Sequence, residues 1–158
     1  MSRTVEIALT VNGESISASV PARQNLVDFL RHDLGLTGSH VGCEHGVCGA
    51  CTMNVDGMAV RGCLMLAAQA HGCTVTTVEG LSDQGRSTAL QAAFTRRNAL
   101  QCGFCTPGML ASALAYIDAG GAPDRAAIRA HISGNYCRCT GYQSIVDAIC
   151  DTIKEARA

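Results

Sequence analysis

Ten cysteines in a chain of 158 residues constrain its fold more than any other feature. Three of them have the spacing Cys43-x4-Cys48-x2-Cys51, and Cys63 follows after eleven intervening residues. This is the spacing of plant-type [2Fe–2S] sites, where four thiolates hold a two-iron core. Zinc sites usually use cysteine pairs two residues apart, so the pattern favours iron–sulfur over zinc or structural thiols.

Glycines in the same segment fit this interpretation. Gly42, Gly46 and Gly49 allow the backbone to wrap closely around an inorganic core and to point N–H groups at its sulfurs. His45 also lies in this loop, and a histidine replaces cysteine in some clusters. Four cysteines are already present, so we expect His45 to be solvated or to contact the ligands without binding iron.

A second set of four cysteines lies further along the chain. Cys102-x2-Cys105 precedes a helix start, and Cys137-x-Cys139 lies between two expected helices. Two pairs at helix ends can converge at one end of a bundle, where helix N-termini favour thiolate charge. By spacing alone, zinc remains an alternative to iron–sulfur at this second set.

Sequence patterns divide the chain near residue 82. In the first half, alternating residues predict hairpins over 4–20 and 53–60, with turns at Asn12-Gly13 and Asp56-Gly57. We expect a helix over 25–34 with Gly35 at its C-terminal cap, a short helix over 64–70, and a strand over 74–78. A small sheet packed on one helix is predicted.

The second half reads as about four helices. A polar stretch over 79–86 is expected to link the halves, and Ser87 to cap the next helix. Thr106 followed by Pro107 predicts another helix start, with Thr106 as the cap. Further helices are expected over 123–132 and 143–156. The predicted domains are therefore 1–81 and 82–158, an α+β unit followed by an all-α unit.

Composition and charge exclude several functions. A net charge of −1 and the absence of tryptophan argue against a nucleic-acid partner. The apolar stretch over 109–117 is too short to span a membrane, and the N-terminus has no apolar export segment. We expect a cytoplasmic chain, where reduced thiols bind metal. No nucleophile–base pair or phosphate loop is present, and Cys73 and Cys150, outside both sets, are expected to be structural.

Longer motifs around both sets resemble one known family. The segments QCGFCTPG at 101–108 and NYCRCTGY at 135–142 resemble the second cluster motif of the xanthine oxidase family of molybdenum hydroxylases. GCEHGVCGACT at 42–52 resembles that family's plant-type cluster loop, and VEGL at 78–81 its exit from the first domain. The resemblance spans about residues 4–150, and the chain resembles the separate small iron–sulfur subunit of such enzymes.

The resemblance implies a fold and a path for electrons. The expected fold is a ferredoxin-like β-grasp [2Fe–2S] domain followed by a four-helix-bundle [2Fe–2S] domain. Electrons from a molybdenum–pterin centre in a large subunit would pass through the helical-domain cluster and the β-grasp cluster to a flavin. Gln101 would hydrogen-bond the pterin, and Cys139 would both bind iron and contact the pterin amino group. The implied iron ligands are Cys43, Cys48, Cys51, Cys63, Cys102, Cys105, Cys137 and Cys139.

The same resemblance implies partners, which are a large molybdopterin-binding subunit and a medium FAD-binding subunit. The pterin is expected in its cytosine dinucleotide form, and the assembly as a dimer of heterotrimers. Two rival functions stay open from the residues alone: a free-standing two-cluster ferredoxin, and a zinc-stapled interaction module. Weak acidity argues against the first, because soluble ferredoxins usually steer toward partners by strong negative charge.

Overall fold

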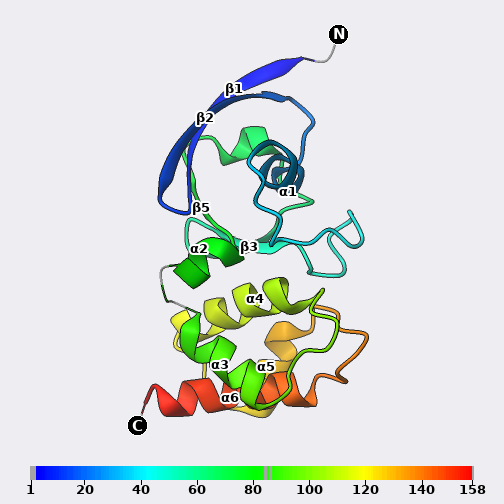
Figure 1. Cartoon of the computed structure of the whole chain (residues 1–158), viewed down its shortest axis with the longest axis vertical. Helices are drawn as coiled ribbons and strands as arrows, with labels where there is room; N and C mark the ends of the chain where they lie inside the picture. Colours follow the sequence, from blue (N-terminus) through cyan, green and yellow to red (C-terminus); the bar gives the residue numbers. More distant parts are fainter. Residues whose placement is uncertain (1–2, 84, 86, 158) are drawn as a thin grey trace.

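The structure, a computed structural model, describes residues 3–83, 85 and 87–157. The expected domain ends at 1 and 158, the first two residues of the N-terminal segment, and positions 84 and 86 of the expected linker lie outside the described residues. Figure 1 shows a sheet with its helix at the N-terminal end of the molecule and a bundle of helices at the C-terminal end. The expected α+β order of the two units is confirmed.

The N-terminal unit is a mixed five-stranded sheet in the order β2-β1-β5-β3-β4. β1 pairs antiparallel with β2 and parallel with β5, while β3 pairs antiparallel with β5 and β4. Figure 1 shows the strands curving around the helix that follows β2. The strands are β1 (Thr4–Val11), β2 (Glu14–Pro21), β3 (Thr52–Val55), β4 (Met58–Arg61) and β5 (Thr74–Thr76).

Both predicted hairpin turns are present. Asn12 and Gly13 have φ of 51° and 91°, and Asp56 and Gly57 have φ of 49° and 85°. A two-residue turn with positive φ at both positions matches the right-handed twist of the flanking strands. These turns fix the register that places Ile7, Leu9 and Val11 on the buried face of β1.

The helix expected over 25–34 is present with an unexpected form. It begins as α1 (Leu26–Asp28), capped by the side chain of Asn25, which accepts a hydrogen bond from the Asp28 amide. It then widens into a π-helix over Phe29–Asp33. Four apolar side chains are buried against the sheet as a result: Leu26, Val27, Phe29 and Leu30. The short helix expected over 64–70 is a 3-10 turn, Ala67–Ala70.

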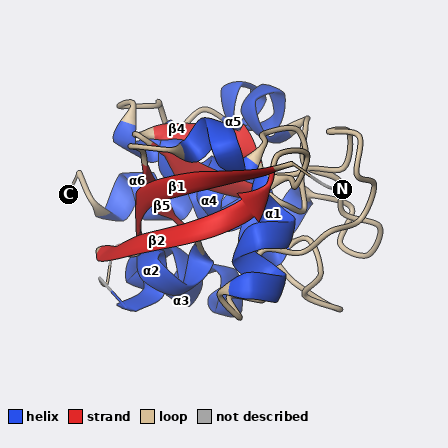
Figure 2. Ribbon diagram, turned by 90° about the horizontal axis from the view of Figure 1, so that it is seen from above, coloured by secondary structure: helices blue, strands red, loops and turns tan. Residues whose placement is uncertain are grey.

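The C-terminal unit is a bundle of α3, α4, α5 and α6, as predicted, with α2 packed beside it. Figure 2, viewed from above, shows these helices lying beneath the sheet. Ile145, Val146, Ile149 and Ile153 line the buried face of the last helix. The bounds are α2 (Val78–Asp83), α3 (Thr88–Arg96), α4 (Thr106–Asp118), α5 (Arg125–Ile132) and α6 (Gln143–Glu155).

One cap prediction was wrong, at Thr106, and one is confirmed in position alone, at Ser87, the N-cap residue of α3. The cap of α4 is Cys105, and Thr106 is already the first helical residue, so its hydroxyl makes no cap bond. Ser87 precedes α3 as predicted, but its buried hydroxyl also lacks a partner among the described residues. Asp124 does cap α5, because its carboxylate accepts a hydrogen bond from the Ala127 amide. Side-chain caps cannot be assigned from residue type alone, because a rotamer decides each bond.

The stretch expected as a polar linker is largely helix α2. Leu81 within it is buried in the core of the bundle, and Gly80 lies against the side chain of Asn12 in the first hairpin. The division predicted after residue 81 therefore falls inside this helix.

Across the described residues, no helix is both long enough and apolar enough to cross a membrane.

Close backbone packing joins the two units. Gly108 in the first turn of α4 lies directly on the loop of the first cysteine set, so that a Cβ at this position would meet the carbonyl oxygen of Gly49 at 2.2 Å. Ala50 lies on the same contact, and a Cβ would meet its carbonyl at 3.1 Å. Only glycine permits this approach of a helix to a loop.

We expect Gly108→Ala to destabilise the protein. Alanine gains about 1 kcal/mol of helix propensity over glycine, but overpacking against a fixed backbone typically costs about 1–3 kcal/mol. We expect the clash to win and to lower the thermal midpoint of the iron-loaded protein by about 5 °C. Ala119→Ser, exposed at the end of the same helix, is the control and leaves the midpoint unchanged. An unchanged midpoint for Gly108→Ala would contradict this packing.

Candidate iron–sulfur centres

The loop between α1 and β3 brings the first cysteine set together. The amide of Cys48 donates a hydrogen bond to the Cys43 sulfur at 3.3 Å, as expected of a loop that points N–H groups at sulfur. The Cys43 and Cys48 thiols contact each other, and the thiols of Cys51 and Cys63 contact each other as a second pair. The spacing in sequence thus folds into two adjacent thiol pairs.

Glycine shapes this loop at two positions. A Cβ on Gly42 would lie 3.2 Å from the Cys48 sulfur, so a side chain there would crowd the ligand. Gly46 has φ of 81°, and a Cβ would meet Leu64 at 2.4 Å. Leu64 is therefore folded over the loop while remaining 62% exposed, which covers one side of the first thiol set with apolar surface.

The two thiol pairs of the first set differ in environment. Hydrogen bonding from the Cys48 amide lowers the pKa of Cys43 to about 6. Burial raises the pKa of Cys51 to about 11, since Cys51 lies in the sheet core. Before metal binds, Cys43 holds negative charge more easily than Cys51, so a metal bound at Cys51 has to displace its proton.

The second cysteine set lies where the loop before α4 meets the loop before α6. The sulfurs of Cys102 and Cys139 are 3.6 Å apart, and both residues are exposed. The thiols of Cys105 and Cys137 contact each other and pack against the bundle core. Two thiolates on one tetrahedral metal with bonds of about 2.3 Å lie about 3.8 Å apart, so the exposed pair already has that spacing.

The electrostatics of the second set differ within its inner pair, Cys105 and Cys137. Desolvation raises the pKa of Cys105 to about 12. Burial also opposes ionisation of Cys137, but hydrogen bonds from the hydroxyl and amide of Thr140 outweigh it and lower the Cys137 pKa. The buried hydroxyl of Thr106, directly after Cys105, has no partner among the described residues. A buried donor without a partner, carried by the residue that follows a thiol of the second set, fits a site that receives a sulfur-rich group.

Each cysteine set consists of two thiol pairs, and this arrangement fits a two-iron core, because each iron of a [2Fe–2S] cluster takes two protein ligands. Among residues 3–83, 85 and 87–157, no three His, Cys, Asp or Glu side chains converge closely enough for a single ion. In the second set each pair combines one cysteine from each loop, Cys102 with Cys139 and Cys105 with Cys137. In the first set the pairs follow chain order.

One backbone hydrogen bond connects the two sets. The amide of Tyr136, the residue before Cys137, donates to the carbonyl of Cys48 at 2.8 Å. The acceptor of this bond, Cys48, is itself a cysteine of the first set, and the donor, Tyr136, directly precedes Cys137 of the second set. Phe104 adds a second contact, because its ring lies against Gly42 and stacks on His40 with ring centroids 4.8 Å apart.

A buried polar network fixes this connection. Asn135, only 2% exposed, donates from its amide nitrogen to the Gly49 carbonyl at 3.0 Å and to the Thr52 hydroxyl at 3.2 Å. Its carbonyl oxygen accepts from the Ser112 hydroxyl at 2.8 Å. Arg61 donates to the Thr52 hydroxyl at 2.6 Å and to the Gly134 carbonyl at 2.8 Å. The sheet and the bundle are thereby held as one body at the point between the two sets.

The predicted pterin-contacting residues are at the exposed edge of the second set. Gln101 is exposed, and its side-chain nitrogen donates to the Cys139 carbonyl at 3.1 Å. Leu100 and Phe104 expose apolar surface nearby in sequence, at 39% and 47%. Gln101 and Cys139 are therefore brought together on a surface that a partner can reach.

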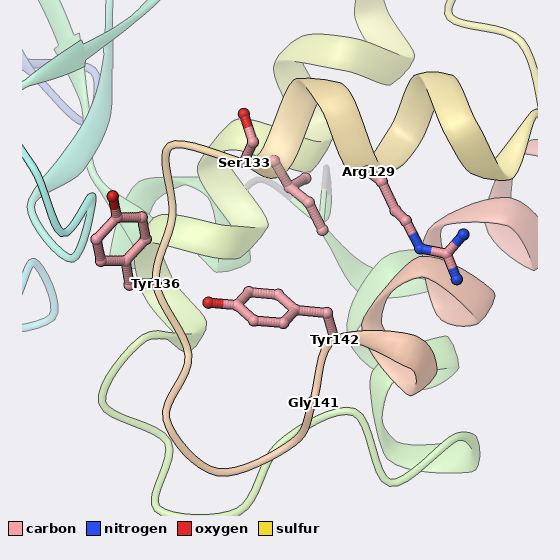
Figure 3. A pocket seen from close by; sticks show the side chains of 6 residues that line it. Arg129, Ser133, Tyr136, Gly141 and Tyr142 are labelled. Atoms are coloured by element: carbon pink, nitrogen blue, oxygen red, sulfur yellow. The ribbon is translucent and has the colours of Figure 1, made fainter.

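Beside the second set is a cavity of about 400 Å³. Figure 3 shows its lining between the end of α5 and the loop that carries Cys137 and Cys139, with the ring of Tyr142 lying across that loop. The Tyr142 hydroxyl accepts a hydrogen bond from the Cys137 amide at 2.8 Å. The lining residues are Arg129, Ile132, Ser133, Tyr136, Gly141 and Tyr142.

The remaining predicted residues stay apart from both sets. His45 is exposed, and its ring nitrogen contacts the Cys43 carbonyl. Cys150 is buried in the bundle core and contacts the Pro123 carbonyl, as expected of a structural residue. Cys73 lies at the sheet, near Asp56, which raises the Cys73 pKa.

Sequence reasoning missed Asn135, Arg61 and Thr140. All three are polar. Asn135 and Thr140 flank the cysteine pair Cys137 and Cys139, and Arg61 hydrogen-bonds to the neighbouring Gly134 carbonyl. Asn135 gave one available signal, since an asparagine in the short segment between a helix end and a cysteine pair commonly hydrogen-bonds to backbone groups. Nothing in the sequence pairs it with Thr52, 83 positions away.

Comparison with known proteins places both sites in [2Fe–2S] domains. A family model described as "[2Fe-2S] binding domain" matches residues 77–150, and one described as "2Fe-2S iron-sulfur cluster binding domain" matches residues 9–102. The first match contains the four cysteines of the second set, and the second match contains those of the first set.

Relatives and solved structures resemble the chain over nearly its whole length. The nicotine 6-hydroxylase small subunit of Paenarthrobacter nicotinovorans is 54% identical over 147 residues, covering 93% of this chain and 88% of that subunit. The caffeine dehydrogenase subunit gamma of Pseudomonas sp. (strain CBB1) is 54% identical over 149 residues, covering 90% and 87%. A chain of quinoline 2-oxidoreductase from Pseudomonas putida 86 superposes with a TM-score of 0.92 at 50% identity, covering 99% and 98%.

We expect Asn135→Ala to loosen the bond between the two sets. The variant removes the buried acceptor of the Ser112 hydroxyl and one of the three donors to the Gly49 carbonyl, and losing a buried partner typically costs about 1–3 kcal/mol. The Tyr136 amide should then exchange with deuterium roughly tenfold faster or more, measured by mass spectrometry of the peptide that contains it. Ser133→Ala, two residues away and exposed, should leave the exchange unchanged. Unchanged exchange in Asn135→Ala would show that the network does not hold the bond.

Proposed function

Because the chain belongs to the small iron–sulfur subunits of the xanthine oxidase family of molybdenum hydroxylases, we propose that its two cysteine sets hold two [2Fe–2S] clusters as a fixed electron relay. The chain is an electron-transfer subunit of a multi-subunit oxidoreductase. Each cluster, when bound, accepts and releases one electron at a time. The proposed ligands are Cys43, Cys48, Cys51 and Cys63 for one cluster, and Cys102, Cys105, Cys137 and Cys139 for the other.

The observation that carries this proposal is the bond from the Tyr136 amide to the Cys48 carbonyl. It leads from a ligand of one set to a ligand of the other through covalent bonds and one short hydrogen bond. The surrounding network of Asn135 and Arg61 is buried, so the distance between the sets does not depend on a mobile linker. A zinc-stapled module needs no such connection between its two sites, because zinc is not redox-active and passes no electrons.

The proposed direction follows from exposure. Cys102 and Cys139 are exposed beside Gln101, so we assign this edge to the pterin cofactor of a large molybdopterin-binding subunit, in the cytosine dinucleotide form. The loop of the first set exposes the apolar side chain of Val47, and the exposed Leu64 lies against Gly46 of the same loop, so this surface suits docking of a medium FAD-binding subunit. The family resemblance supports a dimer of such heterotrimers, and the thiolate chemistry of both sets supports a cytoplasmic location.

The substrate of the complex is not chosen by this chain. Relatives above 50% identity bear names that specify nicotine in one case and caffeine in the other. Subunits this similar serve differently named enzymes, so substrate choice is assigned to the large subunit. The proposed role of this chain is to bind and orient the two clusters and to connect them. None of the residues that the structure describes is a candidate group for substrate chemistry.

Cysteine substitutions test the assignment of ligands. Cys102→Ser should abolish one EPR signal of the reduced protein and leave the other intact, because the two sets are separate. Cys48→Ser should abolish the other signal. Cys73→Ala and Cys150→Ala are matched controls and should leave the iron content unchanged. Loss of both signals in either serine variant would contradict two independent sites, and a colourless protein with two zinc ions would contradict the relay itself.

Gln101→Ala tests the proposed pterin contact. Loss of one hydrogen bond to the partner's cofactor should raise the dissociation constant of the large subunit about tenfold, measured by native mass spectrometry of the co-expressed complex. Iron content and both EPR signals should stay unchanged, since Gln101 binds no iron. Gln91→Ala, on α3, serves as the control. Equal affinity of Gln101→Ala and the control would place the large subunit elsewhere.

A further inference from the structure

The hydroxyl of Thr140 lies against a proposed cluster ligand. Its oxygen is 3.1 Å from the Cys137 sulfur, and the Thr140 amide is 3.4 Å from the same atom. Within the described part of the chain, Cys137 is the only thiol of the second set that has a hydroxyl donor. Sulfur is a weak acceptor when protonated and a stronger one as thiolate, so this contact gains strength with negative charge on the sulfur.

The proton of this hydroxyl is directed to the sulfur. The Tyr142 amide donates to the Thr140 oxygen at 3.2 Å, which occupies the hydroxyl as an acceptor on that side. A hydroxyl has a single proton to donate. With the Tyr142 amide on one side and the Cys137 sulfur on the other, the proton points toward the sulfur.

The loop is shaped to maintain this arrangement. Gly141 and Tyr142 both have positive φ, 69° and 68°, so the chain turns sharply back after Thr140. A left-handed conformation costs a residue other than glycine about 1–3 kcal/mol, and it persists only when surrounding contacts hold it. The Tyr142 hydroxyl provides such a contact, because it accepts from the Cys137 amide at 2.8 Å across the loop that Figure 3 shows.

We propose that Thr140 raises the reduction potential of the helical-domain cluster by donating a hydrogen bond from its hydroxyl to the Cys137 sulfur. The inference rests on the proposed ligand assignment. One added electron, supplied by the reduced partner centre, increases the negative charge shared by the irons and the sulfurs. A donor hydrogen bond stabilises the more negative state more than the less negative one, so it raises the potential. Thr140 thereby makes this cluster a better electron acceptor.

Thr140→Val is the direct test, because valine keeps the shape of threonine and replaces the hydroxyl with a methyl group. In an EPR-monitored redox titration of the purified complex, we expect the one-electron equilibrium constant for reducing this cluster to fall about tenfold. For one electron this equals a decrease of about 59 mV. Thr140→Ser keeps the hydroxyl and should restore most of the difference.

The first cluster is the internal control. Its potential, read in the same titration, should stay unchanged in both variants, since its ligands lie in another loop. An equal shift of both clusters, or no shift in Thr140→Val, would overturn the inference. The wild-type protein failing to show a second EPR signal would overturn the ligand assignment instead, so the two failures are distinguishable.

A second measurement avoids dependence on one variant. If Thr140→Val binds less iron at the second set, Thr140→Ala takes its place in the titration. Independently, resonance Raman spectra in D2O should show iron–thiolate stretching bands that shift more in the wild-type protein than in the variant, because an exchangeable hydroxyl proton is hydrogen-bonded to a ligand sulfur only in the wild type. An equal isotope shift in both proteins would overturn the inference.

Discussion

The carbonyl of Gly49 is the point on which the arrangement of the whole molecule depends. It accepts hydrogen bonds from Asn135 and from the amide and hydroxyl of Thr52, and the first turn of α4 packs directly on it through Gly108. Gly49 belongs to the loop of the first cysteine set, while Asn135 leads into the second. A relay needs donor and acceptor at a fixed separation, and this buried contact supplies it without a rigid linker.

The two cysteine sets reach similar chemistry by different physical means. In the first set, glycines let the backbone curl around the thiols, and an amide lowers the pKa of Cys43. In the second, two loops at helix ends each contribute one thiol to each pair, and a side-chain hydroxyl stabilises charge on Cys137. The first set is bounded by the sheet core and the second by the bundle core. Both keep one pair of thiols nearer the surface, where a partner can approach.

Sequence patterns predicted more of the fold than of the site's supporting contacts. Both hairpin turns, the α+β order and the buried face of α6 follow from local periodicity and turn chemistry. Helix α2 and the network of Asn135 did not follow, because each depends on contacts between segments far apart in the chain. The cap of α4 did not follow either, because residue type alone does not decide a cap. Thr106 shows the difference: its residue type favours a cap, but Cys105 occupies the cap position and the Thr106 hydroxyl is buried without a hydrogen-bond partner among the described residues.

The sequence by itself determined the chemistry of this protein. Eight cysteines in two sets supply the sulfur atoms that can bind iron, since residue identity decides which atoms are available as ligands. At the second set the longer family motif, rather than the spacing, favours iron over zinc. Only the tertiary structure decided how the thiols pair, that one backbone bond joins Tyr136 to Cys48, and that Thr140 directs its proton to Cys137. Those outcomes depend on hydrogen-bond and thiol contacts of about 3 Å, and the positions of these residues in the sequence do not predict which of them come into contact.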